Sequence, residues 1–162
     1  MCINRRNAFT LIEVLIVVII MAVLAATIIP QFSSSTKDAK MSNLKFNLQT
    51  IRSQLEMYKE HHLGVYPPAG STTDFTNQMT QKTDQNTTLD PTNGIYGPYI
   101  QNAIPFNPNN NSNTVVILTG NTQPTGPTGS ADGWQYNPAN GWFYPNDSEY
   151  FSSSGSASST LP

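Results

Sequence analysis

The chain has 162 residues, of which 38% are hydrophobic and only 11% charged, whereas a soluble domain usually carries about 25% charged residues. Its 8 Lys and Arg against 10 Asp and Glu give a net charge of −2, so we expect no nucleic-acid partner. One cysteine and two histidines exclude disulfide-stapled scaffolds and cysteine-rich zinc modules. The apolar residues gather near the N-terminus and the uncharged polar residues in the second half, which predicts two segments of different chemistry.

The first segment predicts a membrane helix. Residues 9–29 are almost entirely apolar, and as an α-helix they would span about 31 Å, close to the hydrocarbon thickness of a bilayer. Arg5 and Arg6 precede this run without an acidic residue to offset them, so we expect a cytoplasmic N-terminus and an exported remainder. The run is longer than the apolar part of a removable secretory signal, and no Ala-x-Ala cleavage site follows it. A plain signal anchor explains the length and orientation but leaves Glu13 unexplained.

The residues around Glu13 are more specific. The stretch Arg5–Glu13 reads Arg-Arg-Asn-Ala-Phe-Thr-Leu-Ile-Glu, and an apolar run follows. This pattern resembles the class III signal of type IV pilins and type II secretion pseudopilins. The resemblance implies that a membrane peptidase cuts between Ala8 and Phe9 and methylates the new N-terminal amine of Phe9. It also makes Glu13 the acidic residue of the motif. Ala8 stands where the family usually has glycine, so we expect slower processing.

Electrostatics gives Glu13 a role in assembly. A carboxylate in a low-dielectric environment needs a partner. When helices stack with an axial stagger, the N-terminal amine of Phe9 in a neighbouring copy can supply that partner. Buried ion pairs are best known for fixing register, so we interpret Glu13 as an assembly residue and not as a catalyst. The resemblance also implies that Pro30 is the family's helix-kinking proline, and the polar stretch after it predicts a kink or a locally melted turn.

An amphipathic continuation of the helix is predicted over residues 31–64. Apolar residues recur there at alternating spacings of three and four, which is the pattern of one helical face. They are Met41, Leu44, Leu48, Ile51, Leu55 and Tyr58. Gly64 is the predicted C-cap. The adjacent His61 and His62 point about 100° apart on a helix, so we expect them to interact with the helix C-terminus and not to share a metal.

Two further stretches are similar to major pseudopilins of type II secretion. The run 48–59, followed by Val-Tyr-Pro at 65–67, resembles the end of their long helix. The segment 94–100 resembles a Gly-Pro-Tyr segment that precedes their sheet. The chain departs from the family pattern at Ile104–Pro108, where a motif containing Asp and Trp-Gly tends to stand.

The second half predicts a small head of mixed secondary structure. We expect a short helix near 75–79, a strand within 114–119 and a β-hairpin over 133–145. The fold class is therefore α+β, with a long N-terminal helix packed on a small antiparallel sheet. Four aromatic residues of the hairpin are expected on one face, covering the helix. They are Trp134, Tyr136, Trp142 and Tyr144. The alternative is an exposed aromatic platform that binds a sugar or single-stranded nucleic acid.

We expect no resident cofactor and no enzymatic activity. The resemblance implies a calcium-binding loop near the C-terminus, for which Asp147 and Glu149 are weak candidates. Two carboxylates fall short of the six to eight oxygens that calcium takes, and a solvated surface loop is the alternative. No phosphate-binding loop or metal-spaced His/Cys set is present, and Cys2 would be lost with the leader.

The predicted organisation follows the chain in five segments. They are a leader peptide at 1–8, a transmembrane and assembly helix at 9–30, its amphipathic continuation at 31–64, a periplasmic head at 65–151 and a serine-rich flexible tail at 152–162.

The resemblance implies a structural subunit of a pilus-like fibre, most closely the major pseudopilin of a type II secretion system. Such a subunit is anchored in the bacterial inner membrane by a single pass and assembles into a periplasmic pseudopilus. Its partners would be its own copies, other pseudopilins, the prepilin peptidase, the lipid bilayer and an inner-membrane platform with a cytoplasmic ATPase. The alternatives are a surface type IV pilin for adhesion, motility or DNA uptake, and a signal-anchored extracytoplasmic binding protein.

Overall fold

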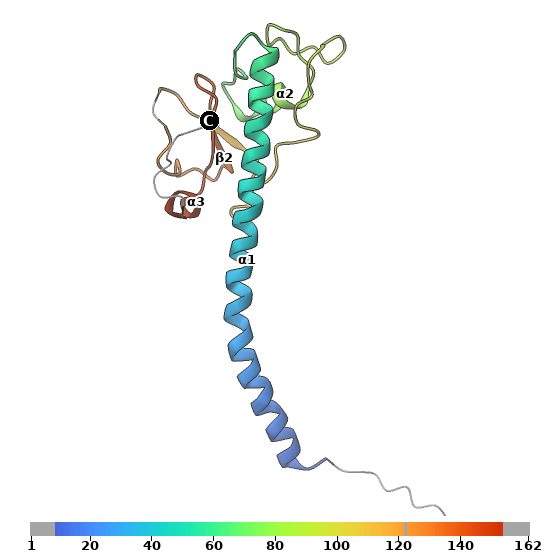
Figure 1. Cartoon of the computed structure of the whole chain (residues 1–162), viewed down its shortest axis with the longest axis vertical. Coiled ribbons are helices and arrows are strands. Elements are labelled where there is room, and N and C mark those ends of the chain that lie inside the picture. The colour runs from blue at the N-terminus through green and yellow to red at the C-terminus, as the bar shows by residue number, and fades with distance from the viewer. Residues whose placement is uncertain (1–8, 122, 154–162) are drawn as a thin grey trace, which may run out of the picture. The chain divides into compact units, whose positions relative to one another are not determined.

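The computed structural model describes residues 9–121 and 123–153, with the side chains of 29–33 left out. The elements in chain order are α1 (Leu11–His61), α2 (Thr72–Thr80), β1 (Val115–Ile117), β2 (Trp134–Asn137), β3 (Trp142–Pro145) and α3 (Ser148–Ser153) (Figure 1). The chain divides into a compact unit that ends at Ala39 and a second unit, the head, that begins at Lys40. The predicted α+β, pilin-like class is confirmed.

Helix α1 is continuous in the described backbone. The backbone is helical through residue 30, so the locally melted turn predicted near Pro30 is absent from the described backbone. The predicted leader at 1–8 lies outside the described residues, as does the tail from 154 onward. The first two residues of the predicted tail, Ser152 and Ser153, belong to α3.

Within the head, the second part of α1 buries the predicted face. Leu44, Ile51 and Tyr58 are fully buried, and Met41 packs against this core at its edge. The predicted helix end is confirmed, because the backbone turns into the left-handed region at Leu63 (φ 57°) and Gly64 (φ 83°). The Gly64 N–H donates to the Lys59 carbonyl at 2.9 Å, which satisfies one carbonyl of the last turn.

The sheet of the head is mixed, in the order β1-β2-β3. The predicted hairpin is confirmed, with β2 and β3 antiparallel and Tyr136 opposite Phe143. Strand β1 runs parallel to β2, with Val115 opposite Trp134, so the expectation of a wholly antiparallel sheet is wrong at this pair. A long irregular connection joins β1 to β2, and such a crossover permits parallel pairing where a tight turn does not.

The four hairpin aromatics that were predicted to share one face of the sheet lie on two different faces. Paired residues of antiparallel strands share a face, so Phe143 lies with Trp134 and Tyr136, while Trp142 and Tyr144 belong to the other face. The Trp134 ring stacks on Phe143 at 5.3 Å between centroids. Trp134 and Tyr136 have no exposed surface, so these rings form the core and not a binding platform.

Buried asparagines hold the irregular loops of this weakly charged head. Asn146 accepts a hydrogen bond from the Thr128 N–H at 2.7 Å, and its amide group donates to the carbonyls of Ser130 and Asp132, both at 3.2 Å. Asn107 donates through its side chain to the Gly133 carbonyl at 3.0 Å. Amide side chains carry both a donor and an acceptor, so they can satisfy loop backbone that lacks a strand partner.

Candidate functional site: the start of the first helix

The start of α1 is built around Thr10 and Glu13. The Glu13 N–H donates to the Thr10 carbonyl at 3.2 Å and to the Thr10 hydroxyl at 3.3 Å. Thr10 therefore caps the helix, and the pair forms one half of a capping box. The Thr-x-x-Glu spacing of these two residues is a recognised sequence signal for this cap, which was not among the predicted features. The cap uses the backbone of Glu13, so its carboxylate remains available for another partner.

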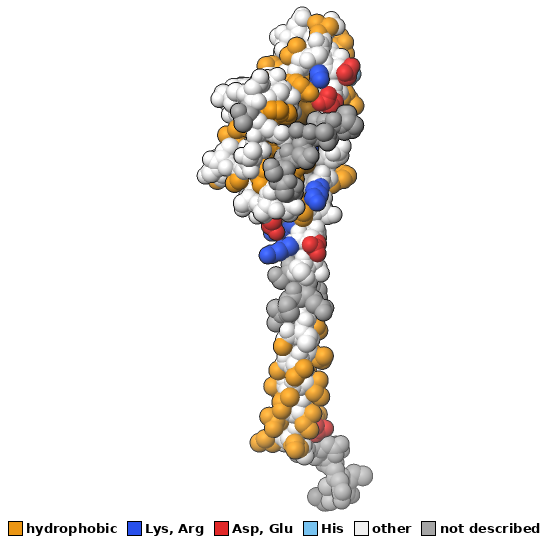
Figure 2. Space-filling model, turned by 60° about the vertical axis from the view of Figure 1, so that its left-hand side comes forward, with side chains coloured by type: hydrophobic (Ala, Val, Ile, Leu, Met, Phe, Trp, Pro, Cys, Tyr) orange, Lys and Arg blue, Asp and Glu red, His pale blue; other side chains and the backbone are white. Residues whose placement is uncertain are grey.

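The helix that follows is apolar on all sides. Leu11–Ile28 has a mean hydropathy of 3.0 and is long and apolar enough to cross a membrane. None of this span is buried in the structure. Figure 2 shows hydrophobic side chains along the exposed surface of this part of the chain. Such a surface is stable only in lipid or against other apolar helices.

Glu13 is the only charged residue between Arg6 and Lys37. It lies in the first turn of α1, where the helix dipole favours a negative charge. Phe9, the predicted first residue of the processed chain, lies four residues before it, just outside α1, and is 80% exposed. Ala8, the residue predicted to precede the cut, lies outside the described residues. For Pro30 the structure describes only the backbone, so its proposed part in assembly stays a prediction.

The weak calcium candidates do not form a cage in the described part of the chain. Asp147 is about nine-tenths buried, and its Oδ1 accepts a hydrogen bond from the Glu149 N–H at 2.7 Å. Its Oδ2 has no hydrogen-bond partner, while Glu149 is exposed in the first turn of α3. One unpartnered carboxylate oxygen does not meet the ligand number of calcium, and the described residues hold no cluster of three or more His, Cys, Asp or Glu. Calcium binding therefore stays a prediction. The oxygen atoms that Asp147 and Glu149 offer do not fit the ligand set of calcium.

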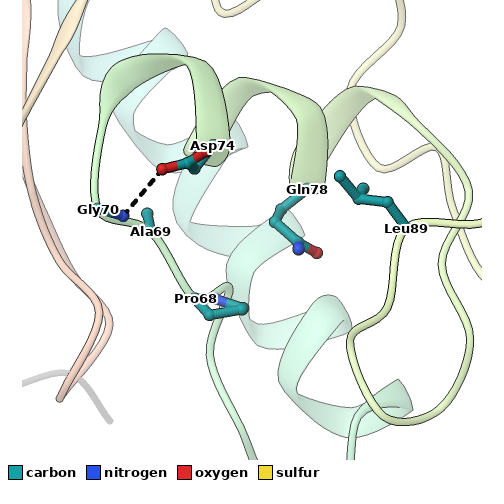
Figure 3. Close-up of a pocket in the computed structure, with 6 residues that line it drawn as sticks. All are labelled: Pro68, Ala69, Gly70, Asp74, Gln78 and Leu89. Carbon is teal, nitrogen blue, oxygen red and sulfur yellow. Dashed lines mark hydrogen bonds between the residues drawn. The ribbon is translucent and has the colours of Figure 1, made fainter.

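An open pocket of about 480 Å³ lies beside α2. It is lined by Pro68, Ala69, Gly70, Asp74, Gln78 and Leu89 (Figure 3). The Asp74 carboxylate accepts hydrogen bonds from the Gly70 N–H at 3.3 Å and the Ser71 hydroxyl at 2.9 Å. The Gln78 amide bonds Tyr58 and Thr87. These polar groups are engaged in holding the local fold, and the pocket lining lacks a pair suited to acid–base catalysis.

Comparison with known proteins identifies the motif at the N-terminus. Residues 3–29, a stretch that includes Ala8, Phe9 and Glu13, match the prokaryotic N-terminal methylation motif. The chain therefore carries the N-terminal motif of type IV pilins and pseudopilins, as the sequence resemblance predicted. Proteins of this class are structural and not enzymes.

The chain is also similar to two curated proteins, both of them core protein G of a type II secretion system. The chain is 39% identical over 56 residues to the type II secretion system core protein G of Pseudomonas aeruginosa, covering 35% of this chain and 39% of that protein. It is 33% identical over 56 residues to the core protein G of Dickeya chrysanthemi, covering 35% of this chain and 37% of that protein. The chain thus spans less than two fifths of the length of these relatives. No solved structure matches the chain.

Proposed function

We propose that this chain is the major pseudopilin of a type II protein secretion system. The observation that carries the proposal is the methylation motif over residues 3–29, with Glu13 four residues after Phe9. The similarity to two type II secretion core proteins supports a role in secretion over a role in the other fibres whose subunits carry this motif. The prepilin peptidase removes residues 1–8 and methylates Phe9, after which the subunit is ready for assembly.

The apolar helix then has two successive environments. Before assembly it lies in the inner membrane, with the N-terminus in the cytoplasm and the head in the periplasm. The Arg5–Arg6 pair on the N-terminal side supports this orientation. An inner-membrane platform driven by a cytoplasmic ATPase extracts the subunit, and its helix packs against copies of itself and other pseudopilins. In the fibre, Glu13 of one copy pairs with the Phe9 amine of its neighbour.

A surface type IV pilin is the second candidate function. It is favoured by the departure at Ile104–Pro108 from the motif that tends to follow the Gly-Pro-Tyr segment in major pseudopilins. Such a pilin would use the same leader, helix and Glu13, but its fibre would be exposed at the cell surface. Immunogold labelling of intact cells separates the two, because a periplasmic fibre is not labelled until the outer membrane is permeabilised.

Cysteine cross-linking tests the proposed fibre. If Glu13 lies level with the neighbouring Phe9 amine, adjacent helices are offset by four residues, which is about 6 Å. If the helix extends back to Phe9 in the fibre, Ile16 and Ile20 lie on nearly the same helical face as that residue. We therefore expect a copy with Ile16→Cys to cross-link efficiently to a copy with Ile20→Cys in oxidised membranes.

The same experiment contains its own control. The chain has one cysteine, Cys2, which the proposed cleavage removes, so the processed chain has no competing thiol. Cross-links between two copies that both carry Ile16→Cys should be several-fold weaker. Equal yields for the matched and the offset pairs would contradict the proposed register, and no cross-link in either pair would contradict helix packing between copies.

A further inference from the structure

Three asparagines of the chain stand in the pattern Asn-x-Ser/Thr, in which an exported protein can receive an oligosaccharide on the asparagine side chain. They are Asn86, Asn110 and Asn146. A chain rich in Asn, Ser and Thr also contains this pattern by chance, so the sequence alone does not separate the three. The reacting atom is the side-chain amide nitrogen, which has to reach a sugar donor. Its exposure and its hydrogen bonds therefore decide which asparagine can react.

Asn146 and Asn110 use this nitrogen within the fold of the head. Asn146 is only 5% exposed, and its amide nitrogen donates to the carbonyls of Ser130 and Asp132, both at 3.2 Å. Asn110 is exposed, but its amide nitrogen donates to the Asp132 carbonyl at 2.9 Å. The amide oxygen of Asn110 accepts from the Ser112 N–H at 3.1 Å. Both side chains therefore hold loop backbone in place, and neither nitrogen is available to a sugar donor.

Asn86 is exposed in a tight turn of the segment that follows α2. The Asp84 carboxylate builds this turn, because its Oδ1 accepts from the N–H of Asn86 and from the N–H of Thr88, each at 2.8 Å. The Asp84 N–H closes the turn by donating to the Thr88 carbonyl at 2.9 Å. The side-chain amide of Asn86 has no hydrogen-bond partner among the described residues. The fold thus fixes the backbone of Asn86 and leaves its amide nitrogen free to react.

Thr88 supplies the hydroxyl that completes the pattern around Asn86. Its side chain is exposed, and in the described part of the chain its hydroxyl has no hydrogen-bond partner. The turn uses only the backbone N–H and carbonyl of Thr88. In the pattern around Asn110, by contrast, the Ser112 hydroxyl lies 2.9 Å from the Thr114 hydroxyl. The hydroxyl of Thr88 therefore remains available to an enzyme that recognises the pattern.

We propose that Asn86 is a site of N-linked glycosylation, at which a membrane transferase attaches an oligosaccharide from a lipid-pyrophosphate donor. The Asn86 amide nitrogen forms a bond to the anomeric carbon of the first sugar, and the bond from that carbon to the pyrophosphate oxygen breaks. The lipid pyrophosphate leaves with the electron pair, and the nitrogen gives one proton to a base of the transferase. The proposal rests on the exported head of the proposed function, because this pattern is modified in exported proteins.

Sugar transfer to the purified full chain in detergent micelles tests the site without depending on export. The reaction contains an undecaprenyl-pyrophosphate-linked oligosaccharide and an oligosaccharyltransferase whose only sequence requirement is Asn-x-Ser/Thr. We expect the intact mass of the chain to rise by the mass of a single glycan, and fragmentation to locate that glycan on Asn86. A glycan on Asn110 or Asn146, or no transfer to the folded chain, would overturn the proposal.

Two pairs of matched variants separate recognition of the pattern from a general effect on the head. Asn86→Gln should lose the transfer, whereas Asn110→Gln, also a change at an exposed asparagine, should keep it. Thr88→Ser retains the pattern and should accept the glycan. Thr88→Ala should not accept it, although the backbone bonds of the turn to Asp84 remain. Transfer to Thr88→Ala at the level of the parent chain would contradict recognition of Asn86 through this pattern.

Expression in cells that hold the same transferase and donor on the periplasmic side of the inner membrane tests the export on which the proposal rests. We expect the membrane-extracted chain to carry a glycan on Asn86, and a catalytically inactive transferase to leave it unmodified. If the purified chain accepts the glycan but the chain in these cells does not, the head is not exported. That result would contradict the proposed function, whereas failure of the purified chain would contradict the acceptor site itself.

Discussion

Replacing Gly133 with alanine is expected to destabilise the head by about 3 kcal/mol or to prevent its folding. An added Cβ at this position would lie 2.0 Å from the carbonyl oxygen of Ser112 and 2.7 Å from its carbon. Both are backbone atoms, so no side chain can rotate away. The Gly133 carbonyl also accepts from Asn146 at 2.9 Å and from Asn107 at 3.0 Å, which fixes the backbone on both sides of the clash.

Thermal unfolding of the full chain in detergent, followed by tryptophan fluorescence, measures this effect. A loss of about 3 kcal/mol lowers the Tm of a domain of this size by at least about 10 °C. Gly126→Ala is the control, because a Cβ at Gly126 meets no atom within 4 Å. We expect that variant to stay within about 0.5 kcal/mol of the parent chain. Equal Tm values for Gly133→Ala and Gly126→Ala would show that the close packing of Gly133 against Ser112 is wrong.

Replacing Glu13 with glutamine is expected to abolish fibre assembly while leaving membrane insertion intact. Removing one partner of a buried ion pair costs about 3–5 kcal/mol, which lowers the association constant of each subunit contact by more than about a hundredfold. The cap at Thr10 uses the backbone N–H of Glu13, so the substitution leaves the start of α1 formed. The variant therefore separates loss of charge from loss of helix structure.

Filament recovery on a density gradient, with membrane extraction in parallel, measures both parts of this expectation. Glu60→Ala is the matched control, since Glu60 is an exposed acidic residue of the same helix, outside the motif. We expect Glu60→Ala to assemble like the parent chain. Normal filaments from Glu13→Gln would refute the register role of Glu13, whereas loss of membrane insertion would indicate a folding defect in the helix.

Local patterns in the sequence were enough to predict the long helix and its cap. The three-and-four spacing from Met41 to Tyr58 reports directly which residues face the core, and Gly64 supplies the left-handed backbone that ends the helix. The hairpin was also predictable, because its strands and turn are adjacent in the chain.

Features that depend on distant contacts were not predictable in this way. The parallel pairing of Val115 with Trp134 depends on the path of the long loop between the strands. The placement of Phe143 in the core depends on a register that composition does not specify. His62 contacts the helix C-terminus as expected, through the Tyr58 carbonyl, but its second partner, Thr83, lies 21 residues away and was not predictable.

At the start of α1, too, some features were predicted from the sequence and one was missed. Its apolar length and the placement of Glu13 were evident from the sequence, and the motif match over 3–29 agrees with them. The half capping box was also encoded locally, in Thr10 and Glu13, whereas the resemblance to a cleavage motif implies a role for the carboxylate alone. The backbone N–H of Glu13 takes part in the cap, whereas its carboxylate is the group that the proposed assembly would use.

The most direct test of the account is the intact mass of the protein extracted from the membranes of cells that contain the prepilin peptidase. We expect a chain that lacks residues 1–8 and carries one additional methyl group, located on the amine of Phe9 by fragmentation. A catalytically inactive peptidase should leave the full-length mass. An uncut N-terminus in the presence of the active peptidase would contradict the proposed processing and, with it, the pairing of Glu13 with a neighbouring amine.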